Sequence, residues 1–237
     1  MAGTLYLLPV SISDENNLNW ISVEYSILLG QINMFVVENI RTARRFLRQT
    51  NKGIKIDNLQ FIEIGEESVS SSIENAIQYL LEGGNVGLMS ESGVPGVADP
   101  GAELVLQAHK HNIEVMPIVG PSSIVLVLMG SGLNGQTFTF HGYLPIKPKE
   151  RVVKIRQIET ESLKNNSTQI FIETPYRNQA MFQDLVQSCR LTTLLCLGID
   201  LCGKNQILKT KTIEQWRKQP LKIPKMPAIF AIQAQKT

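Results

Sequence analysis

The stretch VGLMSESGVPGVADPG, residues 86–101, carries the strongest fold signal in this chain of 237 residues. It joins a short apolar run, Val86–Ser90, to a glycine-rich loop, Ser90–Gly101, and a helical pattern over Ala102–His111 follows. An apolar run, a loop and a helix in that order indicate a strand–helix unit of a parallel sheet. Because βα loops usually have about 2–6 residues, we expect this longer loop to bind a ligand.

Further apolar runs lie on both sides of this stretch. They are continuous rather than alternating, which is typical of strands covered on both faces. In the first half the expected strands are Leu5–Val10, Met34–Glu38, Phe61–Ile64 and Ile113–Val119, with a helix over Ser68–Leu81. In the second half the expected strands are Phe138–Tyr143, Gln169–Glu173, Thr193–Asp200 and Ala228–Gln233, with helices over Glu150–Thr160 and Tyr176–Cys189. Strands alternating with helices predict an α/β fold with right-handed crossovers.

The segment GSGLNG, Gly130–Gly135, is expected to link two domains, because it contains three glycines and a new pattern follows it. We therefore predict an N-terminal domain over residues 1–134 and a C-terminal domain over residues 135–237.

Composition narrows the class of protein. The chain is 43% hydrophobic, which is enough for a packed core, and its formal net charge of +2 leaves nucleic-acid binding open. Three cysteines with no C-x-x-C pair indicate a reducing compartment. We find no signal-peptide pattern and no apolar run near the roughly 20 residues that span a membrane. A cytoplasmic protein without membrane association is expected.

Ligands of open parallel sheets bind at the carboxyl ends of the strands. In the glycine-rich loop, Gly93 and Gly96 permit positive φ and close backbone approach. Asp99 before Pro100 fits either a helix N-cap or a ligand contact. A second loop, Val119–Ser123, presents two hydroxyls at a helix N-terminus, which either hold a carboxylate or simply cap the helix. A third loop begins at Pro9.

Other nucleotide and hydrolase signatures are missing from the sequence. It contains no G-x-G-x-x-G, no G-x-x-x-x-G-K-[ST] and no G-x-S-x-G. His109 and His111 are two residues apart in an expected helix, so they do not face one metal ion. No metal site is expected.

These loops, in this order, resemble those of the tetrapyrrole methylase superfamily of S-adenosylmethionine-dependent methyltransferases. Within it the chain looks most like the branch that methylates a cytidine 2′-hydroxyl of small-subunit ribosomal RNA. The likeness covers nearly the whole chain, through the segments Gly3–Pro9, Glu38–Arg41, Ser90–Gly101, Val119–Ser123, Phe140–Pro145 and Glu173–Arg177. The chain departs from the family pattern at Ser13, Asn39, Ile40 and Ile199–Gly203.

The resemblance implies two α/β domains, a mostly parallel N-terminal sheet and a mixed C-terminal sheet, with S-adenosylmethionine in a cleft between them. It also implies a homodimer and no metal. The amino-acid end of the cofactor would contact the glycine-rich loop and the two serines, and its adenine the start of the last strand. The implied contacts are Pro9, Ser90, Glu91, Ser92, Gly93, Val97, Ala98, Asp99, Ser122, Ser123, Pro227 and Ala228.

Methyl transfer to a hydroxyl needs positioning and benefits from a nearby base. Glu38 and Glu91 stand at expected strand ends and are the candidate bases. Each is otherwise an ordinary solvated loop carboxylate. An aspartate that the family carries is Asn39 here, which removes another possible base.

Two basic clusters are candidate contacts for ribosomal RNA. Four arginines at helical spacing would share one helix face, where like charges repel each other. They are Arg41, Arg44, Arg45 and Arg48. The second cluster contains Lys147, Lys149 and Arg151. Either cluster contacts RNA phosphates or forms an ordinary solvated surface.

Two other functions fit the same sequence. The first is methylation of a small molecule such as a tetrapyrrole, which would not need the four arginines. The second is binding of S-adenosylmethionine or RNA without catalysis, which the altered positions such as Asn39 would explain.

Overall fold

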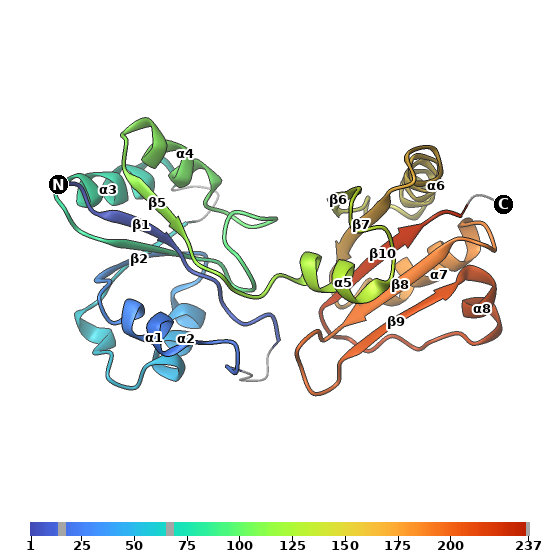
Figure 1. Ribbon diagram of the computed structural model, residues 1–237, viewed down its shortest axis with the longest axis horizontal. Coiled ribbons are helices and arrows are strands. Elements are labelled where there is room, and N and C mark those ends of the chain that lie inside the picture. The colour runs from blue at the N-terminus through green and yellow to red at the C-terminus, as the bar shows by residue number, and fades with distance from the viewer. Residues whose placement is uncertain (14–17, 65–68, 236–237) are drawn as a thin grey trace. The chain divides into compact units, whose positions relative to one another are not determined.

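The computed structural model describes residues 1–13, 18–64 and 69–235 of the chain. The chain divides into two compact units, Met1–Ser122 and Ser123–Thr237 (Figure 1). Each unit contains its own five-stranded sheet and its own core.

All strands of the first unit run parallel, in the order β3-β2-β4-β1-β5. They are β1 (Thr4–Leu7), β2 (Met34–Val37), β3 (Gln60–Glu63), β4 (Val86–Met89) and β5 (Glu114–Pro117). Each expected apolar run of this half forms one of these strands, with ends that differ by a few residues. The predicted parallel sheet is confirmed.

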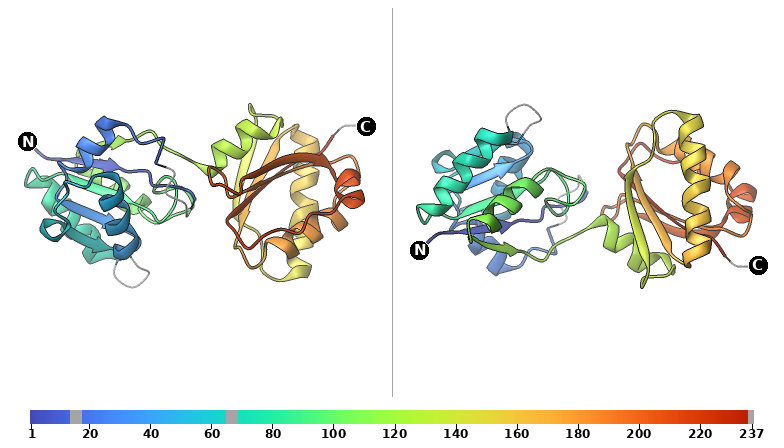
Figure 2. Two further views of the ribbon diagram at one scale, coloured as in Figure 1. Left: turned by 90° about the horizontal axis from the view of Figure 1, so that it is seen from below. Right: turned by 90° about the horizontal axis from the view of Figure 1, so that it is seen from above.

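Helices cover both faces of this sheet (Figure 2). On one face lie α1 (Val23–Leu29) and α2 (Ile40–Thr50), and on the other α3 (Val69–Leu81) and α4 (Ala102–Lys110). A short 3₁₀ helix, η1, spans Ile56–Asn58. All four residues of β2 are buried and alternate between the two cores, because successive side chains of a strand point to opposite faces. This double burial explains why the run is continuously apolar.

The direction of the connections reverses within the sheet. From β1 the chain proceeds to β2 and then β3 at one edge, and it returns through β4 to β5 at the other edge. Such a reversal is where open α/β sheets bind their ligands, at the carboxyl ends of the strands. The loops that follow β1, β2 and β4 all leave from this edge.

The second unit contains a mixed sheet in the order β6-β7-β10-β8-β9. β6 and β7 are parallel and the other neighbours are antiparallel. The strands are β6 (Phe138–Tyr143), β7 (Thr168–Glu173), β8 (Leu194–Ile199), β9 (Ile207–Thr212) and β10 (Ala228–Gln233). The expected α/β class and mixed second sheet are confirmed. β9 is an additional edge strand that the sequence analysis did not identify.

Helices also cover both faces of the second sheet. The core on one face includes Ile155, Phe182 and Trp216, which belong to α6 (Pro148–Asn165), α7 (Asn178–Ser188) and α8 (Ile213–Lys218). On the other face, α5 (Ser123–Ser131) contacts β8, β9 and β10. Gly198 faces Val127 of α5 and lies between two β8 residues of the opposite core, as strand alternation requires.

The division between the units lies earlier than the boundary expected near residue 135, because α5 packs on the second sheet. Gly130, which suggested a linker, lies within α5. A Cβ at this position would overlap Leu208 of β9, so the glycine permits close packing of helix and strand. Among the described residues, no helix is both long and apolar enough to cross a bilayer.

Candidate functional site

Three loops of the first unit meet at the carboxyl edge of its sheet. After β1, the amide of Val10 donates to the carbonyl of Gly93 at 2.8 Å, which joins this loop to the glycine-rich loop. After β5, a Cβ on Gly120 would overlap the ring of Pro9. The hydroxyl of Tyr25 donates to the carbonyl of Pro9 at 2.6 Å. The three loops singled out in the sequence therefore form one surface.

The glycine-rich loop has an unusual backbone. Gly93, Gly96 and Gly101 have φ of 78°, 77° and 122°, and Ala98 has φ of 63°. A left-handed alanine costs about 1–2 kcal/mol, so surrounding contacts must hold it in place. A Cβ on Gly96 would meet no atom within 4 Å, and the side chain of Val97 is 46% exposed. The middle of the loop therefore presents its backbone to open space.

Asp99 does not cap the following helix. The N-cap of α4 is Gly101, which makes no side-chain capping bond, and this excludes one of the two roles expected for Asp99. The carboxyl group of Asp99 instead hydrogen-bonds Ser90 at the start of the loop and lies near Glu38 and Glu91. Burial, together with the negative charges of Glu38 and Glu91, raises its pKa to about 6, and the Ser90 bond opposes this shift.

Glu38 and Glu91 come together because β2 and β4 are neighbours. The Glu38 carboxylate accepts from the Glu91 amide at 3.1 Å. The Thr42 hydroxyl donates to the carbonyl of Asn39 at 3.0 Å and lies 3.4 Å from the Glu91 carboxylate. We call Glu38, Glu91 and Asp99 the acidic edge. Glu38 holds the glycine-rich loop through its bond to the Glu91 amide, whereas Glu91 is exposed and Asp99 is half-buried.

Asn39 replaces the aspartate of the family pattern without loss of the helix start. Its side-chain oxygen accepts from the amides of Arg41 and Thr42 at 3.0 and 3.2 Å, and it is the N-cap of α2. Asparagine and aspartate cap helices about equally well. The replacement therefore preserves the fold at this position and removes one negative charge from the edge.

The four arginines of α2 share one face, as the spacing predicts. They line a groove of about 1250 Å³ together with Asn39, Ile40, Thr42, Gln49 and Glu63. Arg44 pairs with Asp57 at 2.8 Å and lies over the ring of Phe61. Arg41, Arg45 and Arg48 are exposed and have no ion-pair partner among the described residues.

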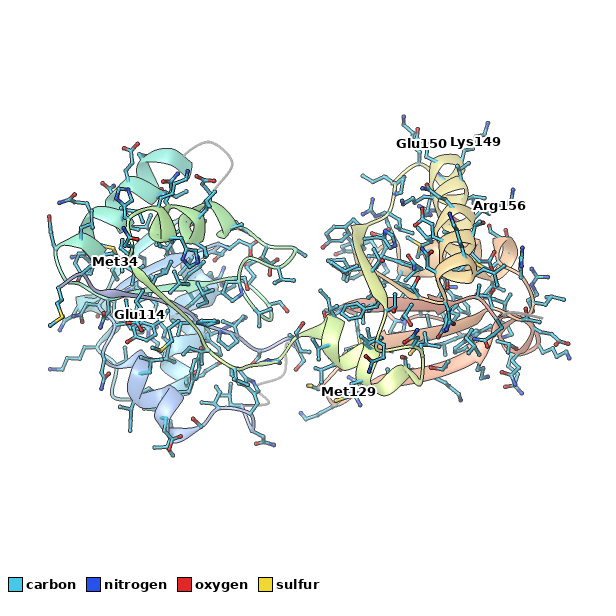
Figure 3. The ribbon with its side chains drawn as sticks, turned by 45° about the horizontal axis from the view of Figure 1, so that its top comes forward. Met34, Glu114, Met129, Lys149, Glu150 and Arg156 are labelled. Atoms are coloured by element: carbon cyan, nitrogen blue, oxygen red, sulfur yellow. The ribbon has the colours of Figure 1, made fainter. Side chains whose placement is uncertain are left out.

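The second basic cluster does not form one surface. The guanidinium of Arg151 is buried and pairs with Asp184 at 2.6 Å, and it also donates to the carbonyl of Ile146. The expectation that Arg151 contacts substrate is therefore wrong: it holds α6 against α7. Lys147 forms an exposed pair with Glu150, and Lys149 projects from the start of α6 (Figure 3).

The residues expected near an adenine lie in the second unit. The carbonyl of Pro227 accepts from the amide of Asp200 at 3.0 Å, and Ala228 pairs with both Glu173 and Ile199. Asn178 donates to the carbonyl of Met226 at 2.8 Å, so it helps to fix this segment. Of the two serines, Ser122 is the last residue of the first unit and Ser123 begins α5.

Sequence reasoning missed the role of Asp99 as a titrating carboxyl group and the contacts of Thr42 and Asn178. For Asp99 no local signal exists, because its position near Glu38 depends on the pairing of β2 with β4. Among the described residues, no group of three acidic, histidine or cysteine side chains is arranged so that it could hold a metal ion, the acidic edge included.

Comparison with known proteins gives a consistent group of relatives. The chain is 30% identical over 217 residues to ribosomal RNA small subunit methyltransferase I of Halalkalibacterium halodurans, covering 90% of this chain and 67% of that protein. It is 31% identical over 185 residues to the protein of the same name from Vibrio cholerae, covering 78% of this chain and 60% of that protein. It is 26% identical over 220 residues to the protein of the same name from Buchnera aphidicola subsp. Acyrthosiphon pisum, covering 92% of this chain and 74% of that protein.

Solved structures show the same fold. A uroporphyrin-III-C-methyltransferase from Thermus thermophilus aligns with a TM-score of 0.58 at 14% identity, covering 98% of this chain and 93% of that one. No family model matches the chain.

Proposed function

Since the chain belongs to the ribosomal RNA small subunit methyltransferase I family, within the tetrapyrrole methylase superfamily, we propose that it transfers a methyl group from S-adenosylmethionine to a ribose hydroxyl of small-subunit ribosomal RNA. The acidic edge carries this proposal. It sets three carboxyl groups beside the exposed backbone of the glycine-rich loop.

The chemistry of the acidic edge fits S-adenosylmethionine. That molecule carries a positive sulfonium and a positive ammonium group, both of which carboxylates attract. Its own carboxylate needs N–H donors, which the open backbone around Gly96 can offer. The fit supports a site for the amino-acid end of the cofactor on the first unit.

Two buried polar atoms of the first unit are unpaired near the loops after β1 and β5. The hydroxyl oxygen of Ser11 and the indole nitrogen of Trp20 have no hydrogen-bond partner among the described residues. Ser11 follows the loop after β1, and a Cβ on Gly120 would lie 3.4 Å from the Trp20 ring. Buried polar groups of folded proteins are almost always paired, so these two atoms are exceptions within the first unit.

The carboxyl groups of the edge have different tasks. When bound, S-adenosylmethionine supplies the methyl group. For the transfer, the RNA hydroxyl would have to be held in line with that methyl group, and a carboxylate of the acidic edge would accept the hydroxyl proton. Asp99 is suited to accept this proton, because its pKa of about 6 lies close to neutral pH. Glu38 positions the loop through its bond to the Glu91 amide.

Titration calorimetry of the full chain with S-adenosylmethionine tests the first step, and transfer of labelled methyl groups to small-subunit RNA from cells without the gene tests the second. Asp99→Asn should lower the turnover number by about 10²-fold. The matched control is Glu74→Gln, an exposed carboxylate on α3, which should keep full activity. Absence of cofactor binding would exclude a methyltransferase, and methylation of uroporphyrin in place of RNA would identify the small-molecule alternative.

Contacts of Pro227 and Ala228 with an adenine, and those of Ser122 and Ser123 with the cofactor carboxylate, stay predictions. Association into a homodimer is a further prediction, for which analytical ultracentrifugation is the direct measurement.

A further inference from the structure

The groove along α2 is large and is lined mainly by positively charged side chains. Its lining includes all four arginines of the helix, which has no acidic residue in its first turn. From Arg41 to Arg48 the face extends about 10 Å, at about 1.5 Å per residue. This length is enough to contact more than one phosphate of an RNA strand.

The four arginines are not equivalent. Arg44 is held by Asp57 and by the ring of Phe61, so its guanidinium is already engaged. Arg41, Arg45 and Arg48 keep their charges free of any partner among residues 1–13, 18–64 and 69–235. The structure therefore separates one arginine that helps to shape the groove from three that are open to a ligand.

This arrangement is unfavourable for the isolated helix. Each like-charged pair at a spacing of three or four residues costs about 0.2–0.5 kcal/mol. Arg41 also places a positive charge in the first turn, where the helix dipole favours a negative one. An anionic ligand along this face removes both costs.

We propose that the α2 groove binds the phosphates of a single-stranded RNA segment through Arg41, Arg45 and Arg48. The proposal rests on the proposed function and names the surface that delivers its substrate. Arg41 directly precedes Thr42, whose hydroxyl lies close to Glu91 of the acidic edge, so a nucleotide at that end of the segment can reach the carboxylates.

The position of the reacting group favours one strand over a duplex. The reacting hydroxyl must approach the half-buried Asp99, which an unpaired nucleotide can do more easily than one held in a helical stack.

The test measures binding of the full chain to a short, unstructured, labelled oligoribonucleotide by fluorescence anisotropy over a range of salt concentrations. For single strands, each phosphate contact contributes about 0.7 to the slope of log K against log salt. Arg41→Gln, Arg45→Gln and Arg48→Gln should each reduce the magnitude of the slope by about 0.7. Arg44→Gln should reduce it by less than half of that amount.

Lys110→Gln is the matched control, because it removes one exposed positive charge from α4 on the opposite face of the same sheet. An equal change of slope in this control would overturn the proposal in favour of general charge attraction. Tighter binding of a duplex than of the single strand would also overturn the proposal. Binding of phosphatidylserine vesicles without binding of the oligonucleotide would do the same.

Calorimetry with S-adenosylmethionine on the triple glutamine variant separates this proposal from the proposed function. Cofactor affinity should be unchanged within twofold while RNA binding is lost. If the triple variant binds the cofactor and still binds RNA as the parent chain does, only the α2 assignment is contradicted. If the parent chain itself does not bind the cofactor, the proposed function is contradicted.

Discussion

The two units use charged side chains in opposite ways. In the second unit, Arg151 is buried against Asp184, and Glu173 is buried against Arg177. In the first unit, the arginines of α2 and two carboxyl groups of the acidic edge are exposed or half-exposed, and backbone contacts hold the loops. The buried pairs join elements of the second unit, whereas these arginines and carboxyl groups of the first unit stay accessible to solvent.

Removing the buried arginine is the strongest way to test this contrast. Arg151→Met should lower the free energy of unfolding by about 3 kcal/mol, because it leaves Asp184 without its partner. Urea denaturation gives this value. Lys149→Met, at an exposed position on the same helix, should change it by less than about 0.5 kcal/mol. Equal effects of the two substitutions would contradict a structural role for the buried arginine.

Backbone packing in the first unit gives the next largest effect. Gly120→Ala places a methyl group against the ring of Pro9 and should cost about 2 kcal/mol. It should also weaken binding of S-adenosylmethionine, because the loops after β1 and β5 must separate. Gly132→Ala is a control with open space around the position, where backbone strain alone costs about 1 kcal/mol. Thermal unfolding and calorimetry measure the two effects.

The pKa of Asp99 gives a smaller, pH-dependent effect. Its folded pKa of about 6 lies above the ordinary value of 3.8, so the stability it contributes is present at low pH and is lost as pH rises through about 6. Asp99→Asn should therefore stabilise the chain at pH 8 by about 1 kcal/mol, after allowance for solvent screening, and have little effect at pH 4. Denaturation at both pH values measures the difference. A larger gain at pH 4 would contradict the assignment.

The smallest effect concerns repulsion on α2. Arg45 lies four residues after Arg41 and three before Arg48, so Arg45→Gln removes two like-charged pairs and should stabilise the chain by about 0.5 kcal/mol at low salt. Lys52→Gln, just beyond the helix, should give no gain. The gain should vanish at high salt, since surface charges are screened there. A loss of stability would mean that Arg45 has a structural role.

Much of the fold was predictable because buried elements have apolar residues at a regular spacing in the sequence. The four residues of β2 are buried on both faces, and the sequence there is continuously apolar. β9 was missed because it is an edge strand whose residues are mostly half-exposed. The place of α5 in the second unit was missed because Gly130, near its end, resembles a linker residue, although it packs against Leu208.

The candidate site was predictable in its loops but not in its chemistry. The spacing of glycines indicated the glycine-rich loop, and the helical period indicated the arginine face. The pairing of Arg151 with Asp184 and the approach of Asp99 to Glu38 join residues far apart in the chain. No local pattern encodes such contacts.

By itself the sequence determined the α/β class, the position of the three loops at the carboxyl edge and the arginine face of α2, because periodicity and glycine spacing are local properties. Tertiary structure alone decided which charges are buried and paired, which stay free, and which carboxyl group has a raised pKa. These properties depend on strand order and helix packing, which bring residues from distant segments within a few ångströms of one another.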